Sequence, residues 1–147
     1  MRLEIEKKPT IDDATAAQLH CAIMALRSYG PSSFASLTDG AGNYVQVAGG
    51  GVTCMLERRD AATGRHFRGY KDQKSKVFPD GTVLVFGGGE VRLSADEWFT
   101  AQEVEGVFVA FLGSSELPSS VKWRDITAIL AGTDVSASQS AENPERS

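Results

Sequence analysis

Apolar and polar residues alternate at the start of the chain. In the stretch RLEIEK, Leu3 and Ile5 alternate with glutamates, which is the pattern of a strand with one face in water. The stretch is short and opens the sequence. We therefore predict a short strand here, at an edge of a sheet.

The next stretch, TIDDATAAQLHCAIMALRSYGP, changes to a helical period. Thr10 and Asp13 have the spacing of a capping box, and Gly30 with Pro31 forms a stop signal. This pattern predicts a helix between these signals. Its apolar face is expected to consist of Leu19, Ala22, Ile23 and Leu26.

The period then returns to two. SFASLTD and NYVQVAG flank the turn DGAG, and GVTCMLERRD and RHFRGYKD flank AATG, so two antiparallel hairpins are predicted. GTVLVFGG with EVRLS predicts one long or broken strand, in which Gly87, Gly88 and Gly89 mark a bulge or bend.

A second helix is predicted in TAQEVEGVFVAFLG. Thr100 and Glu103 form a T-x-x-E cap, and the apolar residues that follow recur on one face. The order of elements predicts an α+β fold: a single domain with an antiparallel sheet of about five to six strands and two main helices packed on one face.

Length and composition set the limits of this domain. The 147 residues with 41% apolar content suit one compact unit, which we place at residues 1–131. Residues 132–147 are polar and are expected to form a disordered tail. The sequence shows neither a signal peptide nor a membrane span, so we expect a cytoplasmic protein with no membrane partner. Cys21 and Cys54 are interpreted as buried thiols.

Charge is segregated along the chain. Residues 57–76 hold seven Lys or Arg against three acids, whereas residues 80–116 hold seven acids against Arg92 alone. The net charge is only -4. A bipolar field of this kind can steer a charged partner, although enzymes also carry uneven surfaces.

No arrangement of residues predicts a cofactor or a metal site. The glycine triplets lack the spacing of phosphate-binding loops and are interpreted as turns. The second hairpin could gather an acid, bases and guanidiniums on one sheet face, as small ribonucleases do. Those residues are Glu57, Arg58, Arg59, Arg65, His66, Arg68 and Tyr70. Parity instead places Arg58 on the face opposite Glu57 and Arg59, and we expect no catalysis.

The succession GGGEVRLSADEWFTAQEVEGVFVAFLGSSELPSSVKW resembles the closing signature of a bacterial immunity-protein family of polymorphic toxin systems, often encoded beside deaminase toxins. In that family a Gly-Gly-Glu leads into a strand, followed by a polar turn, a Phe-rich amphipathic helix, and a Pro and Trp at the close. The matching positions here are Gly88, Gly89, Glu90, the helix at 101–112, Pro118 and Trp123. The resemblance covers roughly residues 1–130; the basic second hairpin and the polar tail depart from it.

The resemblance implies a non-catalytic inhibitor that binds a toxin domain and covers its active site, with no direct nucleic-acid contact. Many such toxins have basic clefts, so the acidic segment is expected to accelerate association. The alternatives are a small sheet-face nuclease and a scaffold interaction domain. Trp123 is expected in the core. Candidate partner-binding residues are Glu90, Asp96, Glu97 and Trp98, with Glu57 and Arg59 of the second hairpin. The cognate toxin and the oligomeric state stay open.

Overall fold

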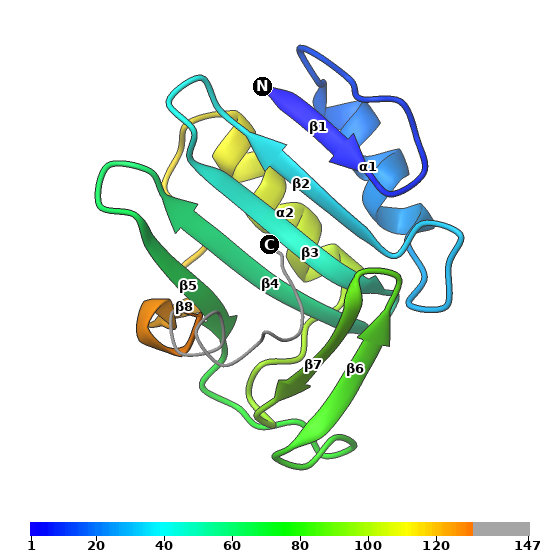
Figure 1. The fold of residues 1–147 in the computed structure, drawn as a ribbon, viewed down its shortest axis with the longest axis vertical. Helices are drawn as coiled ribbons and strands as arrows, with labels where there is room; N and C mark the ends of the chain where they lie inside the picture. Colours follow the sequence, from blue (N-terminus) through cyan, green and yellow to red (C-terminus); the bar gives the residue numbers. More distant parts are fainter. Residues whose placement is uncertain (131–147) are drawn as a thin grey trace.

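The computed structural model describes residues 1–130, and the predicted tail at 132–147 lies outside them. The fold is α+β, as predicted: two main helices cover one face of a six-stranded antiparallel sheet of order β1-β2-β3-β4-β5-β8, and β6 and β7 pair separately (Figure 1). The elements are β1 (Arg2–Ile5), α1 (Ala16–Ala25), β2 (Phe34–Thr38), β3 (Tyr44–Gly50), β4 (Thr53–Asp60), β5 (Arg65–Tyr70), β6 (Thr82–Phe86), β7 (Gly89–Leu93), α2 (Ala101–Leu112) and β8 (Lys122–Asp125). Residues 127–130 form a further short helix.

The main core lies between the sheet and the helices. Alternate strand residues point toward α1 and α2, because successive side chains of a strand face opposite sides. This face carries fully buried apolar side chains from β1 to β4, and the helices contribute theirs from the other side. The largest of them are Leu3, Leu37, Val45, Val47, Leu56, Leu19, Ile23, Leu26 and Phe108.

Helix α2 begins as predicted, with a complete capping box between Thr100 and Glu103. The cap predicted for α1 is wrong. Its N-cap is Thr15, whose hydroxyl accepts the Gln18 N–H while the Gln18 side chain accepts the Thr15 N–H. Asp13 instead adopts a positive φ of 51°, in a segment that crosses the outer edge of β1 before the helix starts. A glutamine completes a capping box as a glutamate does. The pair Thr15 and Gln18 lies at the first turn of the helix, whereas Thr10 and Asp13 precede it.

The two hairpins β2–β3 and β4–β5 form as predicted, but the segment after them does not form one long or broken strand. It folds back at Gly87 and Gly88 into the separate hairpin β6–β7. A Cβ at Gly87 would meet the Glu6 carboxylate, which would have to move, and Gly89 adopts a φ of 137°, a conformation that favours glycine. The hairpin lies across the uncovered face of the sheet and buries a second, smaller core. This core consists of Ala48, Met55, Leu84, Leu93 and Trp98.

The two cysteines differ in exposure, so the expectation of two buried thiols is half wrong. Cys54 is buried on β4, whereas Cys21 is exposed on α1. Burial, with a contribution from Glu103, raises the pKa of Cys54 to about 12.

We therefore expect a thiol reagent at pH 8 to label one cysteine of the folded protein and both after unfolding. At this pH only about one in ten thousand Cys54 side chains is a thiolate, the reactive form. Mass spectrometry of the labelled protein gives the count, and Cys21→Ser should abolish labelling of the native state. Rapid double labelling of the folded chain would contradict the burial of Cys54.

Candidate functional site

The face of the six-stranded sheet opposite α1 and α2, here called the open face, carries Glu57 and Arg59 of the candidate residues, and the other four lie on β7 and in the loop before α2. One polar residue of each strand lies directly opposite a polar residue of the next strand. The strand register therefore aligns these side chains into one row that crosses the whole sheet. We call this the polar row. It runs Glu4, Ser36, Gln46, Glu57, Arg68 and Arg124.

The centre of the polar row is fixed by hydrogen bonds. The Glu57 carboxylate accepts from Arg68 Nε at 3.1 Å and Nη2 at 2.8 Å, and from the Gln46 amide at 2.9 Å. The Glu57 and Arg68 side chains are each 13% exposed. Charge-assisted, two-pronged pairs of this kind have a defined geometry. The row therefore presents its charges in fixed positions.

The end of the row at β8 is held by two acids from the loop before α2. Glu97 accepts from Arg124 Nη1 at 2.7 Å and lies 3.9 Å from Arg68 Nη1, so it stands between two adjacent guanidiniums. Asp96 also binds Arg124, at 3.2 Å. The hydrogen bond to Asp96 is the main cause that raises the pKa of the Arg124 guanidinium; Glu97 adds to it and burial opposes it. Arg124 further stacks over the Tyr70 ring, 4.4 Å from its centroid.

These contacts change the expected roles of Glu97 and Trp98. Glu97 is 3% exposed and Trp98 5% exposed, so neither lies on the surface as a partner-binding residue would. Trp98 packs in the smaller core, where its ring stacks on Phe78 at a centroid distance of 4.3 Å. The side chain of Asp96 is 18% exposed and is occupied by Arg124. The sequence predicted an exposed polar turn here. The structure differs because the hairpin β6–β7 and strand β8 cover this loop.

A cleft of about 400 Å³ opens where the β6–β7 hairpin meets the open face. Glu57 and Arg68 lie in it, Glu90 stands on its β7 side, and Phe34 with Phe86 lines the end near the hairpin turn. The two phenyl rings meet edge to face, with centroids 6.0 Å apart. The cleft therefore combines fixed charges with aromatic surface, the composition typical of protein-binding sites.

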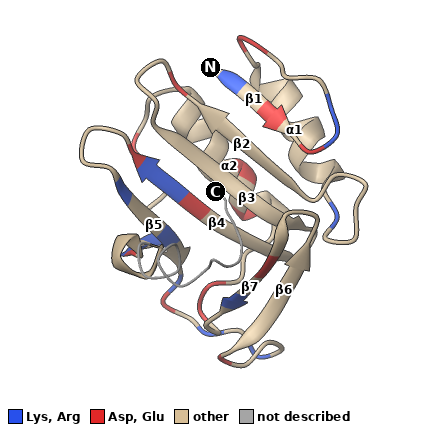
Figure 2. Cartoon of the chain, in the orientation of Figure 1, with Lys and Arg blue, Asp and Glu red and all other residues tan. Residues whose placement is uncertain are grey.

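Two bases of the basic segment pair with acids of the acidic segment in the fold. Lys71 from the basic segment binds Glu103 at 3.2 Å, and Arg68 contacts Glu97. His20 binds Glu105 at 2.9 Å. Figure 2 shows blue and red positions next to each other along β4. The acidic segment is thus not a continuous acidic surface: over residues 80–116, Asp80, Glu90 and Glu116 are exposed and form no ion pair with a described residue.

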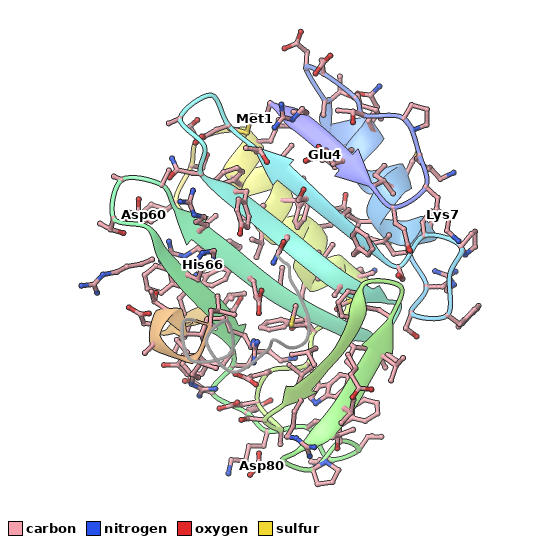
Figure 3. All side chains as sticks on the ribbon, in the orientation of Figure 1. Met1, Glu4, Lys7, Asp60, His66 and Asp80 are labelled. Atoms are coloured by element: carbon pink, nitrogen blue, oxygen red, sulfur yellow. The ribbon has the colours of Figure 1, made fainter. Side chains whose placement is uncertain are left out.

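A second row on the open face aligns Tyr44, Arg59 and His66, which pair across β3, β4 and β5. The Tyr44 and His66 rings lie 6.3 Å apart, and Figure 3 shows His66 on β5, near the end of β4 that carries Asp60. Burial, with the nearby Glu57 charge, raises the pKa of Tyr44. No ion pair among residues 1–130 involves Arg59. Glu57 and Arg59 thus lie on one face, as parity predicted.

Trp123 packs on the opposite, helix-covered face, where it is half-buried against the main core. Its ring lies 5.1 Å from the Arg58 guanidinium, which also lies 4.1 Å from the ring of Phe67 on β5. Burial lowers the pKa of Arg58, and its Nε has no hydrogen-bond partner among residues 1–130. The expectation that Trp123 belongs to the core is confirmed in part. The contact with Arg58 was not foreseen, although the parity of β4 already placed Arg58 on this face.

Two further findings concern the other classes of site. Within residues 1–130, no three His, Cys, Asp or Glu side chains gather in a way that could hold a metal ion. No helix of that part of the chain has the length and apolar character needed to cross a membrane.

Comparison with protein-family models, with curated proteins and with solved structures found no match to this chain.

Proposed function

We propose that this protein is an immunity-type inhibitor that binds a toxin domain in the cytoplasm of the producing cell and covers the toxin's active site with the open face of its sheet. The resemblance of residues 87–123 to the immunity family of polymorphic toxin systems, often paired with deaminases, supports this proposal. Gly88 and Glu90, two of the residues that carry it, belong to the hairpin that borders the cleft. The proposed partner is a protein, and no catalytic step is assigned to the chain.

The observation that carries the proposal is the polar row beside the aromatic end of the cleft. Glu57 and Arg68 are already ordered by their mutual hydrogen bonds, so binding a partner would cost little additional side-chain entropy there. A rigid polar centre with a phenyl edge from Phe34 and Phe86 suits a tight protein–protein contact.

The charges available to a partner are those that the fold does not use. Glu90 and Arg59 are the clearest examples on this side of the molecule, since neither forms an ion pair within the described residues. Glu97 and Asp96 hold β8 in place and are not assigned to the partner. The proposed contact therefore relies on the charges of Arg59 and Glu90 from the candidate set, while Glu57 belongs to the paired centre of the polar row.

The test uses the protein encoded beside this gene, which the proposal expects to contain a toxin domain. We expect co-expression to protect cells from it, and the purified pair to form a complex. Glu90→Lys should slow association with a basic toxin cleft about tenfold at low salt, and the slowing should shrink at high salt. Stopped-flow mixing at two ionic strengths measures this.

Glu116→Lys is the matched control, because it makes the same charge change at an exposed glutamate in the loop after α2. It should leave the association rate near the wild-type value. If the toxin is neither bound nor neutralised, the proposal fails. Equal effects of Glu116→Lys and Glu90→Lys would remove the open face from the proposal, while a folded chain without a toxin partner would favour a scaffold domain.

A second candidate, a small sheet-face nuclease, is favoured by one observation: Glu57, Arg59, His66 and Tyr44 all lie on the open face. However, the Glu57 carboxylate already accepts three hydrogen bonds, from Arg68 and Gln46. A general base must reach its substrate's proton, so this carboxylate would have to leave its partners first. RNA turnover by the purified protein that disappears in both Glu57→Ala and His66→Ala would establish this candidate instead.

A further inference from the structure

The free edge of β6 is unlike the other edges of the two sheets. Figure 1 shows β6 at the margin of the molecule, with β7 on its inner side. The strand reads TVLVF, with Leu84 in the smaller core and the alternate valines turned outward. Val83 is 37% exposed and Val85 61% exposed.

The hairpin register determines which backbone groups of β6 face outward. Phe86 and Gly89 close the turn at Gly87 and Gly88, so they form the hydrogen-bonded pair next to it. Such pairs alternate along an antiparallel ladder, and the next is Leu84 with Val91. The N–H and C=O groups of Val83 and Val85 therefore point away from β7. No backbone hydrogen bond to another described segment involves them.

The remaining edges are covered or carry charges that discourage pairing. The outer side of β1 exchanges hydrogen bonds with Ile11. Strand β8 carries Lys122, Arg124 and Asp125, and β7 carries Glu90 and Arg92. Only β6, among the edges of the two sheets in residues 1–130, combines outward backbone groups, outward valines and an absence of charged or proline residues.

We propose that the β6 edge binds a second copy of this chain, forming a symmetric dimer with a continuous sheet β7-β6-β6-β7. An antiparallel pair centred on Leu84 sets Val83 of one copy opposite Val85 of the other. These are the residues whose N–H and C=O groups point outward, so each pair exchanges both its hydrogen bonds.

The second copy fits this edge because the strand is complementary to itself. Two-fold symmetry brings the same strand of both copies together, so any charged side chain on it would lie beside the same strand of the second copy. The strand has none, and the four valines of the two copies meet on the outer face, flanked on either side by Glu90 and Arg92 of β7. Cross-strand β-branched pairs of this kind stabilise sheets. The edge is separate from the polar row, so this inference does not rest on the proposed function.

The experiment measures mass in solution by light scattering or sedimentation over a range of protein concentrations. We expect the full chain to reach twice its monomer mass of 15.7 kDa. Val85→Lys, which places a charge on the outer face at the two-fold contact, should shift the protein to monomer. Val83→Pro should do the same by removing an outward N–H, while the ladder with β7 stays intact.

Val109→Lys is the matched control, since it introduces the same charge at a valine that is 39% exposed on α2, on the far side of the sheet. It should remain dimeric. Circular dichroism and melting curves establish that each variant is folded, and Val85→Lys decides the case if Val83→Pro does not fold. A wild-type protein that stays monomeric overturns the proposal. So does a dimer that Val85→Lys leaves intact, or an edge that proves to bind only the toxin.

Discussion

Trp98→Ala should destabilise the protein by about 3–5 kcal/mol, the range for deleting a large buried aromatic side chain. Trp98 is 5% exposed and fills the space between the β6–β7 hairpin and the open face, stacked on Phe78. Its removal leaves a cavity in a core of few residues, and these have too few side chains to move in and fill it. Denaturant unfolding of the variant and the wild type measures the loss.

Trp98→Phe is the control for this result. The Trp98 Nε1 atom has no hydrogen-bond partner among residues 1–130, so a phenyl ring loses volume but no hydrogen bond to them. We expect a smaller cost of about 1–2 kcal/mol, because the phenyl ring still fills most of the space of the indole. An alanine variant as stable as the wild type would mean that Trp98 is not packed as described, and would return it to the list of partner-facing residues.

Some elements of the fold could be predicted from the sequence and others could not. Local signals were sufficient for the second helix, because Thr100 and Glu103 fix its start within a few residues. Turn residues were sufficient for the β2–β3 and β4–β5 hairpins. In these cases the information lies close together along the chain.

The loop before α2 was interpreted wrongly because its partners are distant in sequence. Asp96 and Glu97 suggest an exposed turn, yet their cation is Arg124, which lies on a strand beyond the whole of α2. Likewise, Gly87 and Gly88 indicated a break, but the choice between a bend and a hairpin depends on Glu6 and Ser33, which hold the turn from another strand and its loop. The polar row has the same origin: parity assigns its members to a face, and only the register of the strands aligns them.

Glu97→Ala tests this long-range contact and should cost about 2–3 kcal/mol, because it removes a buried carboxylate that makes charged hydrogen bonds, while its partner Arg124 is 39% exposed and partly screened by water. Glu97 accepts the Ser94 N–H at 2.7 Å and also binds Arg124. The variant therefore loses both the hydrogen bond within the loop and the contact that holds β8 to it. The variant also leaves the guanidiniums of Arg68 and Arg124 adjacent without the carboxylate between them. Chemical denaturation gives the free energy of unfolding.

Asp72→Ala provides the matched control, since Asp72 also pairs with a base on β8, Lys122, at 3.7 Å. The Asp72 side chain is 79% exposed, and exposed pairs contribute little, so this variant should stay within about 0.5 kcal/mol of the wild type. In a double-mutant cycle, Glu97→Ala and Arg124→Met should show a coupling of about 1–3 kcal/mol, because the second change removes a cation that the first left unpaired. If Glu97→Ala behaves like Asp72→Ala, or the two effects simply add, Glu97 does not hold β8 to the sheet. Its carboxylate would then be available to a partner, as the sequence first suggested.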